Sequence, residues 1–94
     1  DEARTVLKTI YAAQRLYNLN NDAYNGSLDP LVVGSLVDYD YLENPNAGSP
    51  KFSYSTALTV TGFTARATRN SGVNNTEFIT INQAGSINDA GWTP

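Results

Sequence analysis

The hydrophobic period of the chain changes part-way along, and this change constrains the fold more than any other feature. Over residues 1–19 apolar side chains recur at spacings of three and four, the period of an amphipathic helix. From Lys51 onward the period is two, which is typical of strands with one buried face. A long helix followed by consecutive strands predicts an α+β domain, with the helix covering one face of an antiparallel sheet.

The predicted helix carries two apolar stripes. The wider one spans about 120° and suits a core-facing surface; it contains Ala3, Val6, Leu7, Ile10, Ala13 and Tyr17. Asn18 to Asp22 should end the helix, because Asn and Asp side chains compete for the backbone. On the far side lie Thr5, Ala12, Leu16 and Leu19. Either this second stripe packs on something outside the domain, or these residues are simply tolerated at the surface.

Residues 20–50 are predicted to be mostly loop. Asp29 as N-cap and Pro30 at the first helical position predict a short helix, which Gly34 would stop; Ser27 is an alternative cap. Such an irregular segment needs apolar anchors, and the candidates are Tyr24, Leu28, Leu31, Leu36, Tyr41 and Leu42.

Residues 51–87 predict a meander of three or four strands, enriched in residues that favour sheets. The alternating positions are Phe52, Tyr54, Leu58, Val60, Phe63, Ala65 and Ala67, with a register break at Gly62. A last strand covers residues 77–81, with Phe78 or its neighbours facing inward. Turns are expected at residues 70–72 and 74–75, and residues 88–94 form a tail. The whole chain, 1–94, is then one domain.

Composition excludes several functional classes. The net charge of −3 and the pI near 4.5 argue against a nucleic-acid partner. Cys is absent, so the chain forms no disulfide and no thiolate metal site. His is absent too, which removes the commonest general base. We therefore expect no enzyme activity, no cofactor and no metal.

Some residues still merit weighing for chemistry. Asp38, Asp40 and Glu43 are close enough in sequence to suggest paired carboxylates or a Ca²⁺ site, but they lack the glycine turn and downstream Glu of an EF-hand. Solvated loop acids are the simpler interpretation. Asn25-Gly26-Ser27 and Asn74-Asn75-Thr76 match the glycosylation sequon, which occurs often by chance and implies exposed sites.

Charge order along the chain suggests a subunit interface. Arg4, Lys8 and Arg15 form a basic line on the helix, with Tyr11 beside it, whereas residues 16–50 contain acids and no Lys or Arg. The hypothesis is that the basic line and the second apolar stripe (Ala12, Leu16, Leu19) of one copy meet the acidic loop (Asp38, Asp40, Glu43) of the next. Open head-to-tail contacts of this kind build helical filaments. The alternative is pairing within the chain, or plain solvation.

Several segments, taken in order, resemble the soluble head domain of type IV pilins and pseudopilins. They are Glu2 to Tyr17, with its Ala12-Ala13-Gln14 before Tyr17; Tyr24 and Ser27 to Leu36, with its Gly34-Ser35-Leu36; Phe63 to Ala67; and Thr80 to Ile87, with its Gly85. Together they cover essentially the whole chain, and their order and spacing carry the resemblance. The disulfide of many type IV pilins is impossible here, and the Asp-rich calcium loop of major secretion pseudopilins is not visible.

The resemblance implies a structural subunit of an extracellular filament at the cell surface, which self-associates. It also implies a preceding hydrophobic helix half, which would anchor the precursor in the inner membrane, and partners among other pilins and the membrane assembly machinery. The absence of Met at position 1 fits a missing upstream segment. A pseudopilin, a minor or tip pilin with a binding role, and an unrelated small extracellular binding module are the alternatives. Motility, adhesion, secretion and conduction all remain open.

Overall fold

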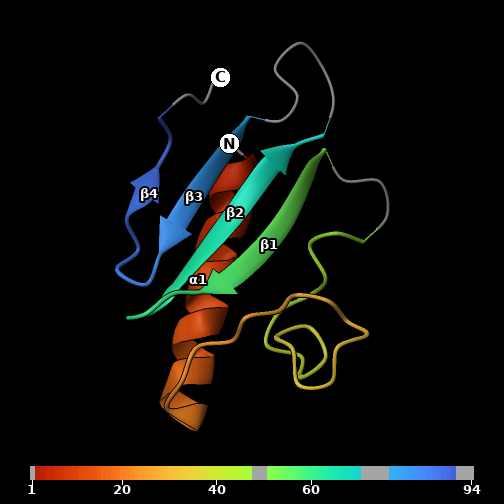
Figure 1. The fold of residues 1–94 in the computed structure, drawn as a ribbon. Helices are drawn as coiled ribbons and strands as arrows, with labels where there is room; N and C mark the ends of the chain where they lie inside the picture. Colours follow the sequence, from red (N-terminus) through yellow and green to blue (C-terminus); the bar gives the residue numbers. More distant parts are fainter. Residues whose placement is uncertain (1, 48–50, 71–76, 91–94) are drawn as a thin grey trace.

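The protein folds as one long helix packed on a four-stranded antiparallel sheet (Figure 1). The structure, a computed structural model, describes residues 2–47, 51–70 and 77–90. Helix α1 spans Glu2–Asn21, and the strands are β1 (Phe52–Leu58), β2 (Phe63–Arg69), β3 (Phe78–Asn82) and β4 (Ile87–Asn88). The spatial order of the strands is β1-β2-β3-β4, so each strand pairs with its neighbour in sequence. The predicted α+β arrangement is confirmed.

Helix α1 buries the wider of its two predicted stripes. Ala3, Leu7 and Ile10 are fully buried, and Ala13 is nearly so. The helix runs two residues further than predicted, to Asn21. It ends where Asp22 adopts a left-handed backbone with φ of 56°, while the Asp22 N–H still donates to the Asn18 carbonyl at 2.8 Å. In Figure 1 the C-terminal turns of α1 extend past the sheet.

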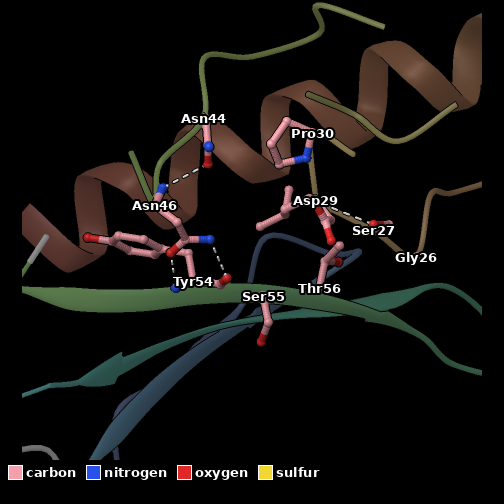
Figure 2. A pocket seen from close by; sticks show the side chains of 10 residues that line it. Gly26, Ser27, Asp29, Pro30, Asn44, Asn46, Tyr54, Ser55 and Thr56 are labelled. Atoms are coloured by element: carbon pink, nitrogen blue, oxygen red, sulfur yellow. Dashed lines mark hydrogen bonds between the residues drawn. The ribbon is translucent and has the colours of Figure 1, made fainter. Parts of the chain in front are cut away.

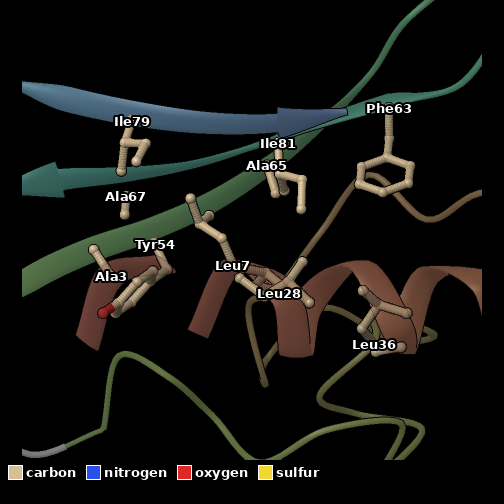
Figure 3. Packing of buried hydrophobic residues seen from close by; sticks show 12 residues of the cluster. Ala3, Leu7, Leu28, Leu36, Tyr54, Phe63, Ala65, Ala67, Ile79 and Ile81 are labelled. Atoms are coloured by element: carbon tan, nitrogen blue, oxygen red, sulfur yellow. The ribbon is translucent and has the colours of Figure 1, made fainter. Parts of the chain in front are cut away.

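The sheet face toward α1 follows the predicted alternation. Phe63, Ala65 and Ala67 of β2 are fully buried, and Ala65 and Ala67 pair with Ile81 and Ile79 of β3. Figure 3 shows these side chains directed from the strands toward the helix. Because alanine is small, the centre of the sheet approaches α1 closely, and the isoleucines and Phe63 fill the flanks.

Alternate positions face the opposite side of the sheet. Phe78 is 45% exposed and lies beneath the Arg66 guanidinium, with the Arg66 Cζ 4.3 Å from the ring centroid. Of the two options for the last strand, its neighbours face inward and Phe78 does not. Leu58 and Val60 continue the predicted alternation but are exposed, Leu58 at the end of β1 opposite the buried Phe63 and Val60 in the β1–β2 turn.

The predicted short helix after Asp29 is wrong, because described residues 22–47 contain turns, bends and irregular backbone but no helix. Asp29 does cap the chain, since its carboxylate accepts the Leu31 N–H at 2.9 Å. The Asp29 carbonyl, however, accepts the Val32 N–H in a tight turn and also the Ser35 hydroxyl at 2.7 Å. Gly34 then turns the chain with φ of 86°. These bonds close a loop where a helix would have continued.

Most of the predicted loop anchors are confirmed, with one exception. Leu28 and Leu36 are buried, and Tyr24, Tyr41 and Leu42 pack partly buried against the core. Leu31 is wrong as an anchor, because it is 90% exposed. The turns predicted at residues 71–72 and 74–75 and the tail from residue 91 lie outside the described residues, whereas Asn88 belongs to β4 and not to the predicted tail.

Candidate functional site

The second apolar stripe of α1 lies on the side of the helix that neither sheet nor loop covers. Leu16 is 50% exposed and Leu19 is 80% exposed, and Thr5 and Ala12 are exposed as well. The stripe therefore does not pack on the sheet. We call Ala12, Leu16 and Leu19 the outer stripe. It is an apolar surface on a rigid element, which is a suitable contact surface for another molecule.

The basic line beside the outer stripe is only partly available for a partner. The Arg4 Nη2 atom lies 2.8 Å from the Asp89 carboxylate, which ties the start of α1 to the residue after β4. That pairing lowers the pKa of Asp89 through a hydrogen bond from Arg4 and through its positive charge. Arg4 is therefore paired within the chain, as the alternative hypothesis expects. Lys8 and Arg15 supply the positive charge that remains for an outside partner.

Tyr11 supports this basic line from the sheet side. Arg15 donates to the Tyr11 hydroxyl at 3.4 Å, and the Arg15 Cζ lies 5.7 Å from the Tyr11 ring centroid. The ring in turn leans on Gly85 in the β3–β4 turn, where a Cβ atom would come within 3.2 Å of it. The turn thus fixes Tyr11, and Tyr11 helps to hold the Arg15 guanidinium close to the helix.

The three loop acids lie apart from the basic line. Leu42 and Glu43 line the same shallow cavity as Val6 and Thr9, which lie on the opposite flank of α1 from Arg4, Lys8 and Arg15. Among the described residues, neither Lys8 nor Arg15 forms an ion pair with Asp38, Asp40 or Glu43. Glu43 and the basic line therefore lie on opposite flanks of the same helix.

The loop acids have local structural roles as well. The Asp38 carboxylate accepts the Gly34 N–H at 2.8 Å, and Asp40 adopts a left-handed backbone with φ of 63°. Of the three acids, Asp38 alone has a carboxylate that accepts a hydrogen bond from the described residues. Within residues 2–47, 51–70 and 77–90, no three acidic side chains gather closely enough to hold a metal ion.

The same loop carries an exposed apolar group that the sequence does not predict. Leu31 and Val33 are each 90% exposed, and Tyr39, which packs against Gly34, is 55% exposed. The signal in the sequence is the run Leu31-Val32-Val33, which falls in the predicted short helix with Leu31 as a candidate anchor. The acidic loop thus presents apolar side chains of its own.

The first glycosylation sequon is not the exposed site that its pattern implied. Asn25 is only 9% exposed, and its side-chain amide donates to the Gly34 carbonyl at 2.7 Å. The Asn25 carboxamide also accepts the Ser27 N–H at 2.9 Å. Its nitrogen is thus already used inside the loop. The second sequon, Asn74 to Thr76, lies outside the described residues.

Comparison with known proteins does not place the chain in a family: no family model, no curated protein and no solved structure matches it. Within the part of the chain that the structure describes, no helix has the length and apolar character to cross a bilayer.

Proposed function

We propose that this chain is a structural subunit of an extracellular type IV pilus-like filament and that it assembles by head-to-tail packing. The order of its sequence segments resembles pilin heads, and a helix on an antiparallel sheet is compatible with that resemblance. In this proposal a hydrophobic segment preceding α1 anchors the precursor in the inner membrane before assembly. Other pilins and the membrane assembly machinery are its partners.

The observation that carries the proposal is the exposed outer stripe. An isolated domain gains nothing from leaving Leu16 and Leu19 in water on a helix that has already buried its other face. Fully burying a leucine side chain contributes about 1.5–3 kcal/mol. A neighbouring copy that covers these two residues would gain cohesion along the filament.

The position of the charges favours a head-to-tail contact over a symmetric dimer. Lys8 and Arg15 lie on one flank of α1, and Glu43 lies on the other. A symmetric dimer through the basic line would place like charges together, whereas translation along a filament brings one flank against the opposite flank of the next copy. Such contacts continue without closing, and opposite charges set their register.

The test uses the full-length subunit in cells that assemble filaments, with filament yield measured by electron microscopy of the sheared surface fraction. Lys8→Glu combined with Arg15→Glu should reduce yield strongly while the subunit remains folded. Adding Asp40→Asn and Glu43→Lys should restore part of the loss.

The control carries the same change in charge at the sheet and the residue next to it. Lys51, the residue before β1, and Arg66 of β2 are exposed, so Lys51→Glu with Arg66→Glu should leave yield close to the unmodified level. Normal filaments from the Lys8 and Arg15 variant, or an equal loss from the sheet control, would reject the head-to-tail contact.

A minor or tip subunit with a binding role is the second candidate. It is favoured by Leu31, Val33 and Tyr39, which stand in water at the loop instead of anchoring it. Leu31→Ser with Val33→Ser separates the two roles: a structural contact through the loop lowers filament yield, whereas a tip function leaves yield unchanged and lowers attachment to surfaces.

A further inference from the structure

The outer edge of β1 is closed at Tyr54 by a side chain that imitates a neighbouring strand. The Asn46 Oδ1 atom accepts the Tyr54 N–H at 2.8 Å, and the Asn46 Nδ2 atom donates to the Tyr54 carbonyl at 2.9 Å. Figure 2 shows the carboxamide lying beside the strand with both bonds. One amide group thus satisfies both backbone groups of one edge residue.

Thr56 presents the same pair of backbone groups two residues further on. In an antiparallel pair, alternate residues direct N–H and C=O away from the partner strand. Tyr54 and Thr56 pair with Ala67 and Ala65 and share this orientation. The Thr56 N–H and C=O have no hydrogen-bond partner among the described residues, although Thr56 is only 9% exposed. Unpaired groups in such a place favour any ligand that bonds them.

A cavity of about 410 Å³ lies against this part of the edge. Asn44 and Asn46 bound it on one side, and residues 26–30 bound it on the other (Figure 2). A Cβ atom on Gly26 would lie 4.0 Å from the Leu58 backbone nitrogen, so the loop also passes close to the edge at Leu58. The open edge therefore has the length of one residue, too short to accept a whole strand.

Asp29 gives the cavity its charge. Its side chain lies next to Thr56 in the view of Figure 2, and no Lys or Arg lines the cavity. An anionic ligand is therefore disfavoured, and a ligand with a cationic group is favoured.

We infer that this cavity is a binding site for an amide, either one peptide unit or a primary carboxamide, bonded to the Thr56 N–H and C=O as Asn46 bonds Tyr54. An ammonium group on the same ligand strengthens binding through Asp29. The site does not depend on filament assembly, since all its groups come from one chain.

The test is a titration of the 94-residue chain with glycinamide, followed residue by residue through backbone amide NMR shifts. Glycine methyl ester is the matched probe, because it keeps the ammonium and carbonyl groups but lacks the amide N–H. Glycinamide should shift the Thr56 amide saturably, and the ester should bind about fivefold more weakly, the effect of one lost hydrogen bond. Equal affinity for the two probes, or no saturable shift at Thr56, overturns the inference.

A variant that fills the cavity gives an independent check. Pro30 lines the cavity, is exposed, and has no N–H to lose, so Pro30→Trp should weaken glycinamide binding by about tenfold or more. Leu31→Trp is the control, since Leu31 is adjacent and exposed but does not line the cavity. Unchanged binding in the Pro30 variant, or an equal loss in the control, would place the probe elsewhere.

Discussion

The carboxamide of Gln14 forms hydrogen bonds with both the N–H and the carbonyl of Asn25. The Gln14 Nε2 atom donates to the Asn25 carbonyl at 2.6 Å, and the Gln14 Oε1 atom accepts the Asn25 N–H at 2.8 Å. Gln14 also donates to the Thr56 hydroxyl at 3.1 Å. This fully buried side chain therefore joins helix, loop and sheet at one point.

Replacing Gln14 by Leu should destabilise the domain by about 2–4 kcal/mol. The change leaves two backbone groups of Asn25 without partners, and each buried unsatisfied group costs about 1–3 kcal/mol. Chemical denaturation measures the loss. Asn20→Ala is the control, because Asn20 is exposed and makes only a long 3.4 Å bond to the Tyr41 hydroxyl. Similar stabilities for the two variants would contradict the central role of Gln14.

Gly85 should resist substitution because of its backbone and its neighbour. Its φ is 78°, a left-handed conformation that costs about 1–2 kcal/mol for a residue with a Cβ. That Cβ would also crowd the Tyr11 ring at 3.2 Å. Gly85→Ala should therefore lower the unfolding free energy by at least about 1 kcal/mol and shift the NMR signals of Tyr11.

Gly26→Ala is the matched comparison. Its Cβ would meet the flexible Leu58 side chain at 3.2 Å, and Gly26 is not among the glycines with positive φ. A smaller loss is expected there. If Gly26→Ala proved the more damaging change, the argument from backbone conformation would fail.

The Arg4–Asp89 pair should be visible in a pH titration. Arg4 lowers the pKa of Asp89, so the folded state holds the ionised carboxylate more strongly than the unfolded chain does. Its contribution to stability is present above the unfolded pKa and is lost as pH falls through the folded pKa. In Arg4→Gln the Asp89 pKa, followed by carboxyl NMR, should rise toward the ordinary value, and an unchanged pKa would show that the pair does not persist in solution.

Tyr54 should be the subject of a second titration, at high pH. Burial, and secondarily the negative charge of Glu2, raises the pKa of Tyr54 to about 12. The protonated phenol is favoured in the folded state, so its contribution to stability is full below the unfolded pKa and declines as pH rises through the folded one. Ultraviolet titration should reveal a tyrosine ionising near pH 12 that is missing in Tyr54→Phe. An unaltered titration curve would assign that ionisation to another residue.

Periodic segments were predictable from sequence, and the loop between them was not. Leu7 and Ile10 follow the helical period, and Ala65 and Ala67 follow the strand period, because burial against one surface imposes a repeat. Leu31 lies in a segment without a hydrophobic period, so the sequence does not predict whether it is buried. The path of its loop depends on the distant bonds from Gln14 to Asn25 and from Asn46 to Tyr54, which no local pattern announces.

The candidate interface was also only partly predictable from the sequence. The exposure of Leu16 and Leu19 follows from the helical period once the buried face is known. The capture of Arg4 by Asp89 does not, because the two residues are 85 positions apart and meet only through the path of β4. The cavity at Thr56 was also beyond prediction, since backbone groups at a sheet edge leave no mark in sequence.

The two hydrogen bonds from Asn46 to the Tyr54 backbone limit how copies of this domain can associate at high concentration. A bare outermost strand is a template on which a second sheet can grow, and such growth ends in irregular aggregates. Asn46 occupies the edge at Tyr54, and loops flank the edge at Thr56. Neighbouring copies therefore cannot pair their β1 edges to form a continuous intermolecular sheet. The arrangement of neighbouring copies then depends on side chains of the helix and loop. Substitutions at these surface positions can change that arrangement without exposing a strand edge to aggregation.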